Sequence, residues 1–374
     1  MTTETLTSLS ARGSSVSRVT RAWYIACRSE DLGHKPLSRT ILDQPMVLFR
    51  GTGGRPGALL DRCPHRNVPL SLGAVRGGQL ECSYHGWRFD EGGACKLVPA
   101  LCATPGKRNP LETNALDATS FPAREQDGFV WVWADATSDA EGEPFHFPLL
   151  DASGYATVRE HVAADASLHA VAENALDVPH TAFLHAGLFR SDEGTRNPIE
   201  VVVRRWSDRV EAEYIGEPRP EGLVGRFLAP QGGVVEHFDR FLLPSIVQVE
   251  YRLGDLHLLV CAALTPESDY RTHLWAVVSF TLPVPAWAVV PVLKPVALRI
   301  FGQDAKVLAR QTETIRRFGG EQYVSTELDV LGPHILRLLR AAERGKVQAG
   351  QSTASPDADP NDDKPTERRV TMEV

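Results

Sequence analysis

The sequence predicts an α+β protein in which a small all-β unit precedes a larger unit of strands and helices. Three observations support this prediction. Between Trp23 and Asp135 the chain is rich in Gly, Pro and short β-branched or aromatic runs, which is typical of small β folds. Apolar and polar residues alternate over Val247–Leu253, as in a strand with one buried face. Apolar residues then recur with helical spacing in 303–318 and 332–344.

Short strands separated by turn-forming residues are expected in the first unit. Glycine-rich stretches at 51–57 and 91–93 supply the turns. A polar, proline-containing linker is expected at 136–148. The expected strands are Met46–Arg50, Ala58–Asp61, Gln79–Cys82, Trp87–Phe89 and Phe129–Trp133.

The second unit is expected to open with a helix from Ala166 to about His185 and to continue with strands. The dipeptide Gly254-Asp255 predicts a hairpin turn between the alternating strand and a strand at His257–Leu264. A further strand is expected at Leu274–Phe280. The following residues are apolar enough to raise the question of a membrane span.

Prolines argue against that span. Pro283, Pro285 and Pro291 each remove a hydrogen-bond donor and clash with a preceding carbonyl, so an uninterrupted helix is not expected. A buried or substrate-facing loop is expected after residue 280, and membrane contact is a minor alternative. The ends of the chain, 1–20 and 346–374, are expected to be disordered tails around domains at 21–140 and 150–345.

Composition narrows the function class. The 374 residues are 43% hydrophobic and 23% charged, as in an ordinary globular protein. The net charge of −7 and the absence of a basic, aromatic-interleaved segment argue against a nucleic-acid partner. Met1–Ser17 lacks the apolar core of a secretory signal, so a cytoplasmic location is expected, with a transit peptide as a minor alternative because of Arg12, Arg18 and Arg21.

Cysteine and histidine pairs form the first candidate site. Cys63-Pro64-His65 is followed, after sixteen residues, by Cys82-Ser83-Tyr84-His85. Such a set can bind zinc, and that alternative remains open. The pairing suits a [2Fe-2S] centre of the kind in which two Cys hold one iron and two His hold the other. The remaining cysteines, Cys27, Cys95, Cys102 and Cys261, are expected to be packed thiols.

Two histidines in the second unit form the core of another candidate site. His180 and His185 are five residues apart, so on a regular helix their side chains would point about 140° apart. Pro179 is expected to break the helix and let both reach one metal. Asp304 is the best candidate for the carboxylate that completes a two-His, one-carboxylate iron site. Alternatively, Asp304 is a favourable charge at a helix start.

Asp177 and Asn174 precede the histidine pair. Asp177 lies three residues before His180, so on a helix the two would share a face, and its carboxylate is expected to accept the outer N–H of that ring. Asn174 lies nearby, but a polar position on a helix rim explains it equally well.

The motif of Cys63, His65, Cys82 and His85, followed by Gly86 and Trp87, resembles that of the Rieske oxygenase family. The resemblance extends from about Trp23 to Arg344, and the segment Trp23-Tyr24-Ile25-Ala26 is similar to the branch of vanillate O-demethylase, aminopyrrolnitrin oxygenase and 3-ketosteroid hydroxylase. It implies an N-terminal Rieske [2Fe-2S] domain and a C-terminal helix-grip (START-like) catalytic domain, in which a curved antiparallel sheet surrounds a long helix.

The resemblance also implies roles for the site residues. His180, His185 and Asp304 would hold a mononuclear Fe(II), with Asn174 beside it. Asp177 would be the electron bridge to His85 of a neighbouring subunit, in a homotrimer. Cys63, His65, Cys82 and His85 would hold the cluster.

A terminal oxygenase is therefore expected. It would use O2 and electrons from NADH or NADPH, delivered by a separate ferredoxin or flavin reductase, since the chain has no GxGxxG nucleotide motif. It would hydroxylate, demethylate or N-oxygenate an apolar aromatic, steroid-like or natural-product substrate, and act as a monooxygenase rather than a dioxygenase. A pure electron carrier would need only the first unit, and a hydrophobic-ligand carrier would need no iron.

Overall fold

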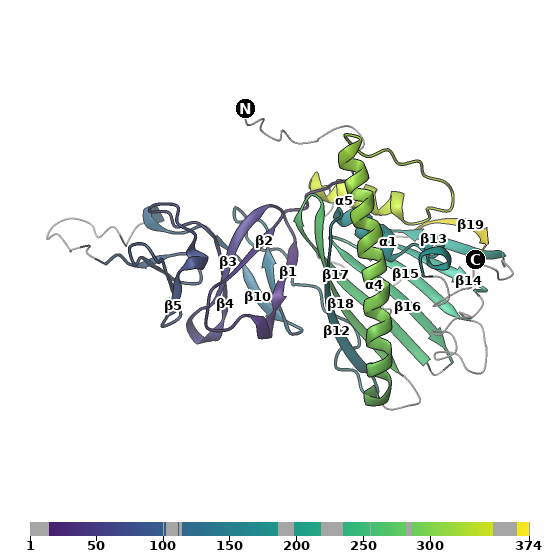
Figure 1. Ribbon diagram of the computed structural model, residues 1–374, viewed down its shortest axis with the longest axis horizontal. Helices are drawn as coiled ribbons and strands as arrows, with labels where there is room; N and C mark the ends of the chain where they lie inside the picture. Colours follow the sequence, from purple (N-terminus) through teal and green to yellow (C-terminus); the bar gives the residue numbers. More distant parts are fainter. Residues whose placement is uncertain are drawn as a thin grey trace.

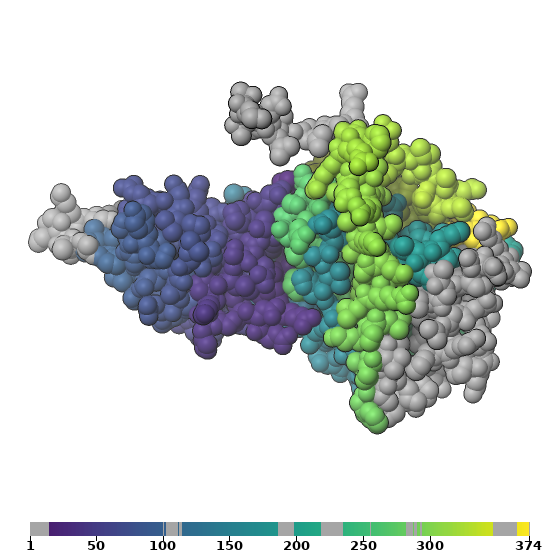
Figure 2. All heavy atoms as spheres, in the orientation of Figure 1, coloured from purple at the N-terminus to yellow at the C-terminus, as the bar shows by residue number. Residues whose placement is uncertain are grey.

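The computed structural model describes residues 15–99, 101, 111, 114–185, 198–217, 235–254, 256–281, 286–346 and 365–373. Two β-rich units lie side by side, and the long helix α4 (Ala286–Arg317) crosses the sheet of the second unit (Figure 1). In Figure 2 the N-terminal unit, coloured purple to blue, forms a lobe of its own beside the second unit. The expected α+β class is confirmed.

Three small antiparallel sheets form the described part of the N-terminal unit. Their strand orders are β1-β11-β10, β2-β3-β4-β9 and β5-β6-β7-β8. Single-turn 3-10 helices lie at Ser29–Asp31, Thr52–Gly54, Leu70–Leu72 and Asn114–Leu116. The strands are β1 (Trp23–Arg28), β2 (Leu37–Ile41), β3 (Gln44–Arg50), β4 (Pro56–Leu60), β5 (Ala74–Arg76), β6 (Gln79–Glu81), β7 (Arg88–Phe89), β8 (Cys95–Leu97), β9 (Ser120–Phe121), β10 (Ala123–Gln126) and β11 (Phe129–Trp133).

An eight-stranded antiparallel sheet forms the second unit, in the order β12-β18-β17-β16-β15-β14-β13-β19. The expected hairpin is present: β16 and β17 meet at Gly254, whose φ of +58° favours glycine. The helices are α1 (Leu168–Ala175), α2 (His180–Leu184), α4 and α5 (Gly332–Glu343). The strands are β12 (Ala156–Ala164), β13 (Pro198–Arg205), β14 (Arg209–Ile215), β15 (Glu236–Leu242), β16 (Ile246–Leu253), β17 (Leu256–Ser268), β18 (Arg271–Thr281) and β19 (Thr366–Glu373).

The two faces of this sheet have different partners because side chains alternate along each strand. The outer face packs on the N-terminal unit through a shared cluster that includes Trp131, Trp133, Leu259 and Trp275. The Thr265 hydroxyl also donates a hydrogen bond across the boundary, to the Ile25 carbonyl. The inner face carries Val247, Val249 and Tyr251 of β16 and is left to the helices and a cavity.

The prediction of a loop after residue 280 is wrong from Ala286 onward, where the chain is helical. Helix α4 begins there and contains Pro291 and Pro295. Each proline removes one backbone hydrogen bond, but Ile300 and Phe301 pack over the cavity, and tertiary packing of an apolar face stabilises helices more than propensity does. Pro283 and Pro285 lie outside the described residues. Within the described ranges, no helix is both long and apolar enough to cross a bilayer.

The expected N-terminal tail, 1–20, is wrong for its last six residues. Ser15 is buried, and its hydroxyl donates to Glu321 and lies 3.0 Å from the Ser167 hydroxyl. Val19 is buried in the main core. These contacts join 15–20 to the second unit, which composition alone does not indicate.

The expected C-terminal tail, 346–374, is wrong for 366–373, which form β19. This strand pairs with β13 along its whole length. Val370 and Met372 point into the core, whereas Thr371 between them and the flanking charged residues, Glu367, Arg368, Arg369 and Glu373, are exposed. The high charge of the segment hides this alternation in the sequence.

Candidate metal centres

A cavity of about 290 Å³ lies between the inner face of the eight-stranded sheet and α4. Its walls are mainly aliphatic, with Val260, Ala262 and Leu274 on the strands and Ile300 and Leu308 on the helix. The inward positions of β15 to β18 supply much of the lining, and β12, α1, α2 and α4 complete it. Such a cavity excludes water and favours an apolar ligand.

His180, His185 and Asp304 converge at the wall of this cavity. Their ligand atoms all lie within 4.8 Å of one another. Asp304 Oδ1 is 3.1 Å from His185 Nε2 and 3.6 Å from His180 Nε2. The side chain of His185 is 1% exposed, that of Asp304 16% and that of His180 20%. The three residues proposed from the sequence therefore meet, although Asp304 is far from the histidines in the chain.

The two histidines meet because they do not lie on one regular helix. His180 is the first residue of the short helix α2, and His185 follows its last residue. The single helix expected from Ala166 to His185 is wrong: α1 ends at Ala175, and α2 begins at His180, directly after Pro179. His185 caps α2 in a non-helical conformation (φ −111°, ψ 34°). The 140° separation of a regular helix therefore does not apply. Pro179 starts a new short helix rather than kinking a long one.

Hydrogen bonds fix both imidazole rings with Nε2 toward Asp304. His185 Nδ1 donates to Gln303 Oε1 at 2.9 Å. His180 Nδ1 donates to the backbone carbonyl of Asp177. In the neutral form of each ring, these partners select the tautomer that leaves the Nε2 lone pair available, which is the usual way in which proteins orient metal-binding histidines.

The electrostatics of the triad suit a cation. Burial opposes the charged form of His180, but Asp177 and Asp304 outweigh it and raise the pKa of His180 to about 9. Burial likewise opposes ionisation of Asp304, and the two histidines outweigh it and lower the pKa of Asp304. Asp304 Oδ1 is buried and accepts no hydrogen bond from the described residues. A buried carboxylate oxygen in this state calls for a positive partner, and a divalent metal ion fits the two-His, one-carboxylate donor set.

Asp177 and Asn174 lie beside the triad. The Asp177 carboxylate is 3.5 Å from His180 Nδ1 and its side chain is 40% exposed. The expectation that Asp177 and His180 share a helix face is wrong, because α1 ends before Asp177; the backbone carbonyl accepts the ring hydrogen bond instead. Asn174 lies in the last turn of α1 and lines the cavity.

Cys63, His65, Cys82 and His85 lie in two loops of the N-terminal unit. Both thiols are buried, and burial is the main cause that raises the pKa of Cys63. The two imidazole rings are 4.6 Å apart between centroids. His65 Nδ1 is buried and has no hydrogen-bond partner among the described residues. A buried ring nitrogen in this state is expected where the nitrogen binds a metal. These four residues fit the donor set of a [2Fe-2S] centre with mixed ligation.

Gly86 and Trp87 shape the second loop. The φ of Gly86 is +69°, a conformation that side chains disfavour, and a Cβ there would lie 3.1 Å from the Pro99 ring. The Gly86 N–H donates to the Cys82 carbonyl and closes the turn. Trp87 stacks on His65 at 4.6 Å with parallel rings. The glycine is therefore required by its own turn, a reason that the motif alone did not supply.

The other cysteines are packed thiols where the structure describes them. Cys27, Cys95 and Cys261 are buried and reduced. Burial raises the pKa of Cys95 to about 11 and those of the other two to about 12. Cys102 lies outside the described residues.

Two features of the sites were missed in the sequence. Gln303 directly precedes Asp304 and orients His185, so its position beside the candidate ligand was the available signal. His237 and Asp239 are buried polar residues two apart on β15, and both line the cavity with Glu217. Their spacing places both on one face of a strand, but only a strand assignment for β15 could have revealed it.

Comparisons with known proteins give a family match for each of the two units. Residues 22–112 match the family model of the Rieske [2Fe-2S] domain, and residues 164–345 match that of the vanillate O-demethylase oxygenase C-terminal domain. The oxygenase component of a chloroacetanilide N-alkylformylase from Rhizorhabdus wittichii is 31% identical over 283 residues, which cover 69% of this chain and 75% of the relative.

Dicamba O-demethylase is a second relative. Its oxygenase component from Stenotrophomonas maltophilia is 37% identical over 187 residues, which cover 50% of this chain and 53% of the relative. The crystal structure of dicamba monooxygenase bound to dicamba superposes with a TM-score of 0.72 at 27% identity and covers 88% of this chain and 99% of that one.

An iron–sulfur domain joined to an oxygenase domain defines an oxidoreductase of the oxygenase class. The chain belongs to the Rieske non-heme iron oxygenases, as a terminal oxygenase.

Proposed function

We propose that this oxygenase inserts one oxygen atom into an apolar aromatic, steroid-like or natural-product substrate by hydroxylation, demethylation or N-oxygenation. The convergence of His180, His185 and Asp304 on an aliphatic cavity supports the proposal. The relatives are named for removing alkyl-type groups, which makes dealkylation of a small aromatic compound the first reaction to test. The Rieske domain would occupy 21–140 and the catalytic domain 150–345, extended by the edge strand β19.

His180, His185 and Asp304 would hold the mononuclear iron. A ferrous ion bound by two imidazoles and one carboxylate keeps open positions at which O2 can be activated beside the substrate. Gln303 and the Asp177 carbonyl would keep the two rings in the metal-binding tautomer. The aliphatic walls would exclude water and hold the substrate against the triad.

Cys63, His65, Cys82 and His85 would hold the [2Fe-2S] cluster that stores electrons. In Figure 1 the sheet of β5 to β8, which carries the second cluster loop, lies at the end of the N-terminal unit away from the eight-stranded sheet. His85 is exposed and Asp177 is 40% exposed, so each is accessible to a second copy of the chain. We infer a homotrimer in which Asp177 links the iron to His85 of a neighbouring subunit.

Electrons would come from NADH or NADPH through a separate ferredoxin or flavin reductase. Relatives are named as oxygenase components, which supports a separate reductase. A cytoplasmic location, where such a reductase and the nicotinamide pool are available, fits this scheme.

Metal analysis of the purified chain tests the proposal. We expect three irons per chain, two with acid-labile sulfide and one without. His180→Ala should lose the single iron and keep the visible absorption of the cluster, whereas His146→Ala, on an exposed histidine, should keep all three. Retention of three irons by His180→Ala would refute the ligand assignment, and zinc in place of iron–sulfur colour would refute the function.

A further inference from the structure

A buried ionic cluster forms one part of the cavity wall. His237 on β15 lies between two carboxylates: its Nδ1 is 2.5 Å from Glu217 Oε2 and its Nε2 is 3.0 Å from Asp239 Oδ1. The exposed fractions of the three side chains are 0%, 4% and 2%. All three residues line the same cavity as the metal triad.

Two tyrosines fix the imidazole from above and below. The ring of Tyr214 on β14 lies 4.4 Å from that of His237 at an interplanar angle of 18°. The ring of Tyr251 on β16 lies 4.1 Å away on the neighbouring strand, at 22°. Both N–H groups of His237 are therefore engaged by carboxylates and its ring is stacked on each side. It has no donor left for a ligand.

The cluster presents no excess positive charge. Burial opposes protonation of His237, but Asp239 and Glu217 outweigh it and raise the pKa of His237 to about 9. Burial and, to a smaller extent, the charge of Glu217 raise the pKa of Asp239, although His237 opposes this rise. The cluster therefore holds one imidazole between two acidic groups. The described lining of the cavity contains no Lys or Arg. What the cluster can offer to a ligand is carboxylate oxygen, which accepts hydrogen bonds and attracts cations.

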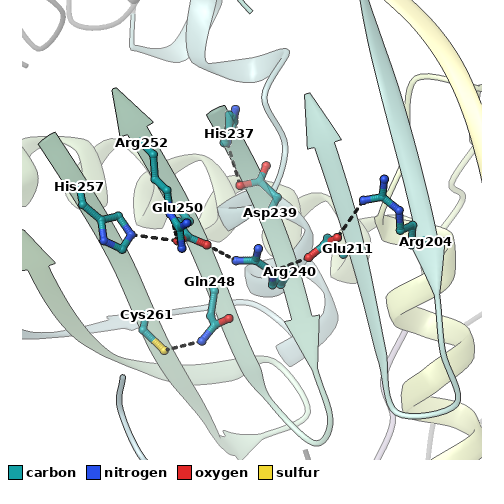
Figure 3. A network of polar contacts seen from close by, with 10 residues as sticks. All are labelled: Arg204, Glu211, His237, Asp239, Arg240, Gln248, Glu250, Arg252, His257 and Cys261. Carbon is teal, nitrogen blue, oxygen red and sulfur yellow. Dashed lines mark hydrogen bonds and ion pairs between the residues drawn. The ribbon is translucent and has the colours of Figure 1, made fainter. Parts of the chain in front are cut away.

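Stability alone does not account for this arrangement. Apolar residues of similar volume often stabilise a core as well as or better than buried ion pairs do, and the rest of the cavity wall is aliphatic. The outer face of the same strands carries a second network, in which Arg240 joins Glu211 and Glu250 and Glu250 contacts Arg252 and His257 (Figure 3). Its side chains lie on the face of the sheet that points away from the cavity, since successive residues of a strand face opposite sides.

We propose that His237, Asp239 and Glu217 recognise the polar group of the substrate, and that this group is a hydrogen-bond donor such as an amine rather than a carboxylate. The inference rests on the proposed function, because it treats the cavity as the substrate site. His237 is a positioning residue that holds the two carboxylates, and the aliphatic walls bind the body of the substrate.

Two probe ligands of similar shape and opposite charge test whether the cavity prefers a cationic hydrogen-bond donor to an anion. We would titrate the iron-loaded full-length protein, without reductant, with 2-naphthylmethylamine and with 2-naphthoate at neutral pH, by calorimetry. We expect the amine to bind at least about tenfold more tightly than the acid, since hydrogen bonds to charged groups have this strength. Equal affinities, tighter binding of the acid or no measurable binding of the amine would overturn the inference.

The control compares two carboxylate-to-amide substitutions, one on the inner face of the sheet and one on the outer face. Asp239→Asn should weaken binding of the amine at least about tenfold and reduce its preference over the acid. Glu250→Gln removes a carboxylate from the outer face and should change neither. If Asp239→Asn does not fold, Glu217→Gln takes its place. Equal losses in the inner and outer variants would contradict the assignment.

Iron content and O2 consumption, measured on the same samples, separate this inference from the proposed function. A chain with full iron and reductase-dependent O2 consumption but the opposite probe preference would overturn the inference alone. A chain without the mononuclear iron would overturn the proposed function, whatever the order of the probes.

Discussion

At the residue scale, the three candidate metal ligands, His180, His185 and Asp304, are oriented by groups outside the triad. Gln303 and the Asp177 carbonyl each engage one Nδ1, so both Nε2 atoms face Asp304 before any ion arrives. The folded chain therefore orients the two imidazole rings before a metal binds, so metal binding need not order them.

Gln303→Leu should weaken iron binding at the mononuclear site by about 10–100-fold, because His185 loses the acceptor that fixes its tautomer. Iron analysis after dialysis against a graded chelator series measures the change, and the cluster absorption should persist. Gln311→Leu, an exposed position on the same helix, is the matched control. Unchanged iron retention in Gln303→Leu would remove this residue from the site.

Asp177→Asn should leave the iron content and the cluster spectrum intact yet abolish substrate-coupled O2 consumption. The amide keeps the backbone carbonyl that holds His180 but lacks the carboxylate charge. Product formed per O2 consumed, with a reductase present, is the measurement, and Asp139→Asn at an exposed position is the control. Full coupling in Asp177→Asn would exclude Asp177 from the electron path.

At the scale of elements, helices α1 and α5 pack against each other at Glu173, a buried carboxyl group on α1. The Glu173 carboxyl group occupies the space that a Cβ at Gly332 would fill, with Oε1 1.8 Å from that position, so a larger residue at the start of α5 would displace the Glu173 side chain. Burial, followed by the charges of Asp329 and Asp177, raises the pKa of Glu173 to about 7.

Glu173→Gln should raise the melting temperature at about pH 8.5 and leave it nearly unchanged at about pH 5. The folded pKa lies above the unfolded one, so the stabilising contribution of protonated Glu173 is fully present below the unfolded pKa and is lost as pH rises through about 7. Glutamine mimics the protonated form at every pH. Thermal unfolding at both pH values should show a difference of roughly 2 °C or more.

Glu313→Gln, on an exposed part of α4, controls for the loss of one negative charge. An equal shift at both pH values would show that Glu173 acts through its size or polarity and not through its titration.

The sequence indicates elements well where the chemistry is local. The β16–β17 hairpin is fixed by alternation and a turn, so it could be predicted. The four candidate cluster ligands lie in two short loops, so their spacing alone suggests a shared site. Asp304 could be chosen only with the family pattern, since a lone Asp near a helix start has a common structural role. The helix through Pro291 and the pairing of β19 depend on tertiary packing, which local propensity does not encode. The His237 cluster was missed for the same reason.

At the scale of the whole molecule, the outer face of the large sheet binds the N-terminal unit and the inner face holds the cavity. The shared cluster around Trp131, Leu259 and Trp275 fixes the two units to each other. A fixed arrangement within one chain is consistent with electron transfer between chains, since neither unit needs to move.

Coexpression of two inactive variants tests transfer between subunits. Cys82→Ala lacks the cluster but keeps Asp177, and Asp177→Asn keeps the cluster. Mixed assemblies should recover part of the coupled activity, because the cluster of one subunit can serve the iron of the next. Their mass should be three times the chain mass of 41.0 kDa. Assemblies of either variant alone should be inactive, and inactive mixed trimers would indicate transfer within one chain.

The position of β19 at the edge of the sheet sets an order for biosynthesis. The ribosome completes β13 well before residues 366–373, so the nascent sheet has an open edge lined by Val201 and Val203 during that interval. An unpaired strand edge invites pairing with another nascent chain. We therefore expect a chain that lacks residues 366–373 to aggregate more than the full chain, because the β13 edge would then stay open.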